Sequence, residues 1–359
     1  MAIDLTRFID VSIIKKSTLT TIGTREIVTL FTSEGTESEI KVITSMTEAN
    51  TEYPATSFPH TNEYLKVFFA NNGAKVEVHE GIVYTDFSID DITELDDDHI
   101  VCAAVSTNSN VETVYAKMKS IATSAAQLTG IHQKILLGRT EVKTDPTSIK
   151  NFAVKFSGEV GAEMTMAAYL SRINVYNDNS IYDYAFTKES VDPEEIEDDD
   201  YGTIIANNMN VDVYLADAVR NCGGNMKDGS DFTNSFVLIV LHQTLTQVLL
   251  NLLTTHIKGN TGISKIYTAI YQELERYVNS GYLSGDKIWT DDDLVKTYNN
   301  RQYQIITKGT PITSGYIVKV LPLEALTDAD KAERKAPPVY VIIADQYGIR
   351  KITINGEVL

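Results

Sequence analysis

The chain has few cysteines, the residues that build disulfide-crosslinked folds and small zinc-binding motifs. Its 359 residues include two cysteines and one tryptophan. Cys102 and Cys222 lie far apart and form no CxxC unit, so neither a disulfide framework nor a zinc ribbon is indicated, and a reducing compartment is favoured. The N-terminal MAIDLTRFID has no apolar core after a basic segment, and no run of about 18 uncharged apolar residues occurs. We therefore expect neither a Sec signal nor a membrane span.

Basic residues are also scarce, and the scarcity is confined to the middle of the chain. The net charge is -18, and residues 31–257 hold 34 acidic against 14 basic residues. Residues 1–30 and 258–359 are nearly neutral. Because the chain exceeds the usual size of a single core, this distribution predicts an acidic domain inserted into a neutral domain built from both termini. The acidic surface aids solubility and disfavours contact with nucleic acid.

Both chain ends carry strand-like patterns without a closing helix. Residues 339–359 contain two apolar runs, VYVIIA and IRKITINGEVL, joined at 345–348, and residues 8–14 alternate apolar and polar side chains. Exposed strand edges template pairing with other chains, so two such ends favour strand addition between subunits. The alternative, in which both runs complete the protein's own sheet, stays open.

Helix and strand patterns alternate between the ends, which indicates an α/β layer. Strands are expected at 26–32, 40–44, 74–79, 99–105, 134–138, 152–156, 210–215, 303–307 and 316–321, and helices at 64–70, 111–128, 161–173, 236–257, 261–279 and 327–335. The predicted architecture is a discontinuous inner α+β domain, residues 1–30 and 205–359, with an acidic α/β domain at 31–204 inserted and extended β-strand arms at both termini.

No segment carries a convincing catalytic or ligand-binding motif. The Gly-rich turn at 223–229 lacks the P-loop lysine and the GxGxxG order, and Asp228 and Asp231 would repel a phosphate. The acidic tract at 191–200 lacks the alternation of a calcium loop, so a solvated loop is expected there. His242, on an apolar helix, is expected in a core or an interface.

The remaining chemical signals are equally weak, so we predict no enzyme, no catalytic residue, no cofactor and no metal. The Asp runs at 96–98 and 291–293 are typical of positions where a helix or strand begins. No HExxH or GxSxG motif occurs. An α/β enzyme or a sugar-binding module that uses the Asp-rich loops stays open as the alternative from another class.

Taken in order, several segments resemble the contractile phage tail sheath family. The sequence LKVFFANNGAKVEV at 65–78 resembles a helix-turn-strand element of the family's inserted domain, and 210–231 resembles its Asn-strand-Gly-Gly turn. Residues 263–285 resemble a helix of the family. Residues 327–338 and 348–356 resemble the C-terminal sequence of one branch of sheath-like proteins. The likeness is strongest from about residue 205 onward.

The resemblance implies a structural subunit that polymerises around a tail tube and drives tube ejection by contraction. Implied partners are further copies, as hexameric rings stacked into a helical sheath, together with the tail tube, baseplate and tail terminator proteins. Nucleic acid and membrane are not among them. The implied location is a virion tail assembled in the host cytoplasm. A tube or baseplate component is the rival among structural proteins.

The resemblance also implies roles for particular residues. The N-terminal arm and the C-terminal strands would join a neighbour's sheet through Ile9, Val11, Ile13, Ile349, Ile352, Ile354 and Val358. The charged helix near 327–336 would touch the tube through Lys331, Arg334 and Lys335. Because acidic residues alternate with these cations, an ordinary surface helix stays open as the other interpretation.

Overall fold

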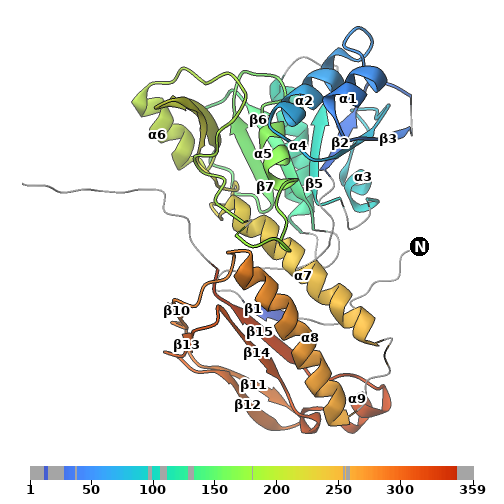
Figure 1. The fold of residues 1–359 in the computed structure, drawn as a ribbon, viewed down its shortest axis with the longest axis vertical. Coiled ribbons are helices and arrows are strands. Elements are labelled where there is room, and N and C mark those ends of the chain that lie inside the picture. The colour runs from blue at the N-terminus through green and yellow to red at the C-terminus, as the bar shows by residue number, and fades with distance from the viewer. Residues whose placement is uncertain are drawn as a thin grey trace, which may run out of the picture.

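The structure is a computed structural model that describes most of the chain. The described residues are 12–14, 28–36, 39–95, 99–105, 111–127, 133–179, 181–253, 255 and 259–345. Two β-sheet bodies are joined by a long helix, α7 (Phe232–Leu253), which runs from one to the other (Figure 1).

The first body is built on an eight-stranded sheet with the order β3-β4-β2-β5-β6-β7-β8-β9. Its six inner strands are parallel, and the two edge strands are antiparallel to their neighbours. The central strands are buried along their whole length, as expected for parallel strands covered on both faces. The strands are β2 (Val28–Thr32), β3 (Ile40–Ile43), β4 (Val76–His79), β5 (Val101–Val105), β6 (Ile135–Thr140), β7 (Phe152–Phe156), β8 (Asn210–Leu215) and β9 (Ala218–Cys222).

Helices cover both faces of this sheet. Side chains of α1 (Met46–Glu52), α2 (Pro59–Ala70) and α5 (Met164–Leu170) share one core with α7. Side chains of α3 (Ile89–Thr93), α4 (Val111–Ala125) and α6 (Asp198–Ala206) form the core on the other face. The prediction that 191–200 is entirely loop is wrong at its end, because Asp198, Asp199 and Asp200 form the first turn of α6. Acidic side chains are favourable there because they face the positive end of the helix dipole.

The helix α7 is long and apolar enough, by length and composition, to cross a membrane, a possibility that the sequence argument had missed. It carries no charged residue, and 67% of its most apolar 18-residue stretch is buried inside the fold. Its neighbour α8 (Gly259–Asn279) packs along it. His242 lies on α7 and is 7% exposed, as expected for a core position. The helix therefore has the burial of a core helix of a soluble protein.

The second body contains a three-stranded sheet with the order β1-β15-β14. One face of this sheet joins the core under α8, and the other packs on a separate cluster around Trp289 and Ile305. The strands are β1 (Ser12–Ile14), β14 (Tyr316–Val320) and β15 (Val339–Ile343), and the surrounding elements are β10 (Lys287–Ile288), β11 (Leu294–Tyr298), β12 (Arg301–Ile306), β13 (Pro311–Ile312), the short helix η3 (Leu323–Ala325) and α9 (Asp328–Ala332).

The predicted α/β class is confirmed for the first body, whose sheet mixes parallel and antiparallel strands. The predicted domain limit between residues 204 and 205 falls within α6 and so inside the first body, because β8 and β9 lie beyond that limit and still pair with β7 and with each other. An alternating strand pattern does not say which sheet the strand joins. The assignment of domains as a whole stays a prediction.

Candidate assembly interface

β15 is the central strand of the second body and has a partner on each edge. β14 runs antiparallel to it, with Val318 opposite Val341. β1 runs parallel on the other edge, with Ile13 opposite Val341. Every residue of β15 is buried. The strand from the N-terminal end therefore completes a sheet whose other strands come from the C-terminal part of the chain.

Among the predicted strand-exchange residues, Ile13 lies in a described strand, and it pairs within its own chain. Ile9, Val11, Ile349, Ile352, Ile354 and Val358 lie outside the described residues. The described pairing is the arrangement expected if the chain end completes the protein's own sheet, and it leaves exchange between subunits as a prediction.

Asp345, the last described residue before the C-terminal segment, is firmly anchored. Its carboxylate is buried and accepts hydrogen bonds from Lys287 Nζ at 2.9 Å and from Asn234 Nδ2 at 3.0 Å. The backbone of Ser284 also donates to the carbonyl of Ala344. The point from which residues 346–359 leave is thus tied to α7 and to β10.

The predicted charged helix is shorter than expected, and its charges are balanced locally. α9 ends at Ala332, so Arg334 and Lys335 follow it. Lys331 pairs with Asp328 at 3.2 Å, and Lys335 pairs with Asp330 at 3.0 Å and with Glu333 at 2.8 Å. Arg334, at φ 59°, makes no ion pair with the residues that the structure describes. Of the three cations predicted to contact the tube, Arg334 is therefore the one without an ion pair to a described acidic residue.

The Gly-rich turn is held by one buried side chain rather than shaped to hold a phosphate. Asn210 Oδ1 accepts hydrogen bonds from the amides of Gly224 at 2.6 Å and Asn225 at 3.2 Å. Asn210 Nδ2 donates to the carbonyls of Asn225 at 2.9 Å and Val154 at 3.2 Å. The amides of Gly224 and Asn225, two of those that would have to face an anion, are therefore already bonded inside the fold. This bonding gives a physical reason for the Asn-strand-Gly-Gly pattern.

The triple aspartate at 291–293 begins a strand, as expected, because β11 starts at Leu294. Asp292 pairs with Lys308 at the surface, at 3.0 Å. Asp293 accepts a hydrogen bond from the Lys308 amide. Asp96, Asp97 and Asp98 lie outside the described residues.

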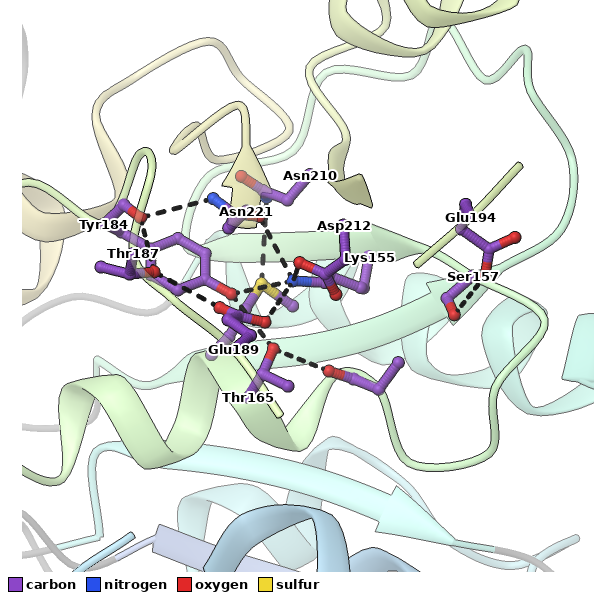
Figure 2. A network of polar contacts seen from close by, with 12 residues as sticks. Lys155, Ser157, Thr165, Tyr184, Thr187, Glu189, Glu194, Asn210, Asp212 and Asn221 are labelled. Atoms are coloured by element: carbon purple, nitrogen blue, oxygen red, sulfur yellow. Dashed lines mark hydrogen bonds and ion pairs between the residues drawn. The ribbon is translucent and has the colours of Figure 1, made fainter. Parts of the chain in front are cut away.

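A buried lysine cluster, which the sequence argument missed, ties together the end of the first sheet. Figure 2 shows the side chains of Glu189, Asp212 and Asn221 converging on Lys155 Nζ, at 2.9, 2.7 and 3.2 Å. The Tyr184 hydroxyl lies 3.0 Å from the same nitrogen. Lys155 is fully buried. Its signal in the sequence was a single charged residue inside the apolar run FAVKF.

The charges of this cluster shift the pKa values of its members. Burial by itself lowers the pKa of Lys155, but the carboxylates of Asp212 and Glu189 outweigh that effect, so the pKa is raised and the ammonium is retained. Burial, and then the nearby Glu189, raise the pKa of Asp212 well above its usual value. One ammonium thus faces two carboxyl groups, and a proton held by Asp212 leaves the cluster neutral.

A second polar cluster on the same sheet joins Glu77 and His79 of β4 with His99, just before β5. No metal-ligand spacing was visible in the sequence because His99 lies 20 positions beyond His79, outside the strand that carries Glu77 and His79. A Glu-x-His pair on one face of a strand was the only local signal.

Comparison with known proteins supports the resemblance found in the sequence. Residues 233–358 match the family described as E217 tail sheath protein gp31-like, C-terminal domain. The resemblance to contractile tail sheath proteins is confirmed. The matched region covers nearly all of α7, then α8, β14 and β15, and so contains the terminal sheet apart from β1. No curated protein sequence shows significant similarity to the chain.

Two solved structures of the anti-feeding prophage, one of its sheath and one of its baseplate, contain chains that share the fold over nearly the whole length. The helical sheath of the anti-feeding prophage in its contracted state is 14% identical, with a TM-score of 0.59 over 97% of this chain and 98% of that one. A chain from the baseplate of the anti-feeding prophage in its contracted state is also 14% identical, with a TM-score of 0.62 over 98% and 99% of the two chains. At 14% sequence identity, these comparisons show a shared fold only.

Proposed function

We propose that the chain is the structural, non-enzymatic subunit of a contractile tail sheath. It polymerises as stacked rings around a tail tube, reaches the baseplate and the tail terminator, and drives tube ejection by contraction in an assembled tail. The observation that carries the proposal is the tail sheath match over the residues that build the β15-centred sheet. Polymerisation through this sheet needs neither a cofactor nor an active site.

The short contact of β1 favours exchange of that strand between subunits. β1 has three residues, and its pairing with β15 contributes a few backbone hydrogen bonds, each worth about 1 kcal/mol net. If β1 leaves its own β15, the few hydrogen bonds that are lost are replaced by the same bonds between that β15 and the β1 of a neighbouring subunit. Such an exchange of identical strands is a strand swap. The buried and anchored β15 offers a fixed edge to either strand.

Engineered disulfides distinguish exchange from self-completion. In the double variant Ile13→Cys with Val341→Cys, the two cysteines occupy partner positions of the β1–β15 pair. If strands are exchanged, oxidation of assembled protein gives ladders of covalently linked subunits on non-reducing gels. The matched control is Val318→Cys with Val341→Cys, which joins β14 to β15 and should give only crosslinked monomer. Crosslinked monomer from both pairs, taken from assembled protein, would contradict exchange.

Electron microscopy tests polymerisation itself. We expect negatively stained full-length protein to form rings or tubes with a wide lumen, and deletion of residues 1–16 or 346–359 to abolish them. Circular dichroism of the deletion variants shows whether each still folds. A full-length protein that stays monomeric at high concentration, whether or not these segments are deleted, would contradict the proposal.

For contact with a tube, we propose Arg334 together with Lys331 and Lys335. Arg334 has the largest expected effect because its charge is not neutralised by the described acidic residues around it. Arg334→Ala should weaken co-sedimentation with tail tubes, and more so at low salt, because exposed charge pairs are screened by ions. Lys319→Ala, an exposed change on β14, is the control. Equal tube binding by both variants would remove Arg334 from the interface.

A further inference from the structure

The polar cluster on β4 and before β5 has the donors of a metal site. Glu77 and His79 alternate on β4 and therefore face the same side of the sheet. His79 Nε2 lies 2.9 Å from Glu77 Oε1, and His99 Nε2 lies 3.6 Å from the same oxygen. The three potential ligand atoms lie within 4.8 Å of one another.

These separations fit the coordination of one small cation. Zinc bonds of about 2.0 to 2.1 Å in a tetrahedron place neighbouring ligand atoms about 3.3 Å apart, between the two distances observed. Small side-chain rotations would therefore bring both imidazole nitrogens and the carboxylate oxygen into range.

The surroundings of His99 hold its ring as a metal site requires. Its Nδ1 lies 2.9 Å from the hydroxyl of Thr29, a fully buried residue of β2. When Nδ1 carries the proton and donates it to Thr29, Nε2 is left as a lone-pair donor facing Glu77. Such a partner on the second ring nitrogen is typical of histidines that bind metals. The ring of Phe31 packs on His79, with centroids 5.2 Å apart, and limits its rotation.

We propose that Glu77, His79 and His99 bind a zinc ion that links β4 to the segment entering β5, across β2. Two imidazoles and one carboxylate favour zinc over calcium or magnesium, which prefer sites made wholly of oxygen ligands. The side chains are 9% to 16% exposed, so the site is shielded but reachable from solvent. This inference concerns the first body and is independent of the proposed polymerisation.

Calorimetric titration of the metal-free full chain with zinc chloride tests the site. We expect one zinc per chain, and at least tenfold weaker binding after His79→Gln, which removes one of the three ligands. The matched control His60→Gln changes a partly buried histidine of α2 outside the cluster and should bind as the unaltered chain does. Thr29→Val should weaken binding roughly tenfold without changing the stoichiometry, because it acts through the orientation of His99.

Two further measurements keep the test decisive. Far-ultraviolet circular dichroism in chelator confirms that each variant is folded, and Glu77→Gln replaces His79→Gln if the latter does not fold. A large excess of calcium should not displace the zinc. Unchanged affinity in both the His79 and Glu77 variants, or displacement by calcium, would overturn the proposal and leave the cluster as an ordinary set of polar contacts.

Discussion

Replacing Lys155 with methionine is expected to destabilise the protein by about 3 to 5 kcal/mol, the usual effect of breaking a buried ion pair. Methionine fills a similar volume but removes the ammonium that Glu189 and Asp212 share at 2.9 and 2.7 Å. Both carboxyl groups would then be buried without a cation. Because domains are stable by only about 5 to 15 kcal/mol, urea unfolding should show a large loss.

The pH dependence of this loss separates a charge effect from a packing effect. Burial already raises the pKa of Asp212, and loss of the lysine raises it further. Because folding raises the pKa of the Asp212 carboxyl, folding favours its protonated form. The stability that this carboxyl contributes is fully present below its unfolded pKa, near 4, and is lost as the pH rises and the buried carboxyl must ionise. The destabilisation by Lys155→Met should therefore be smaller at pH 4.5 than at pH 7.5.

Two controls make the Lys155 prediction specific. Lys66→Met, at an exposed position of α2, should change the unfolding free energy by less than about 0.5 kcal/mol. Adding Glu189→Gln and Asp212→Asn to Lys155→Met should recover part of the lost stability, because no buried charge then remains. A loss that is independent of pH and unchanged in the triple variant would show that Lys155 acts through packing alone.

The predictable elements of the fold are the strands and helices whose apolar pattern is complete within one short segment of the sequence. The apolar runs around Val101 and Leu136 form buried parallel strands, and the helix-turn-strand pattern at 65–78 became the end of α2 followed by β4. The two long helices also begin and end within a few residues of the predicted limits. In each case periodicity within one segment carries the information.

The parts that could not be predicted depend on contacts between distant segments. Lys155 meets Asp212 and Asn221, which are 57 and 66 positions away, and no local pattern marks that meeting. The short helices α1 and α3 were also missed. Ser45 and Ser88 cap their first turns by accepting backbone hydrogen bonds, a weak signal in a sequence read without its fold.

Replacing Asn210 with alanine is expected to destabilise the protein by about 3 kcal/mol, since buried groups left unbonded cost about 1 to 3 kcal/mol each. The fully buried Asn210 side chain makes four hydrogen bonds to backbone atoms, three of them in the Gly-rich turn, and a longer one to Met166 Sδ. Alanine would remove both the oxygen that accepts from the amides of Gly224 and Asn225 and the nitrogen that donates to the carbonyls of Asn225 and Val154. Chemical denaturation measures the loss, and Asn177→Ala, at an exposed position, is the control.

The position of this turn makes a second effect of Asn210→Ala measurable. The turn connects β9 to α7, and the amide of Phe232 at the start of α7 donates to the carbonyl of Gly224. Loosening the turn therefore loosens the link between the two bodies. We expect faster proteolytic cleavage within residues 223–231 and separate unfolding of the two bodies.

Gly223→Ala should act similarly, because its φ of 124° is unfavourable for alanine and the added Cβ would lie 2.9 Å from Asn210 Oδ1. Unfolding in a single transition with unchanged cleavage would mean that the bodies are coupled through α7 packing rather than through Asn210.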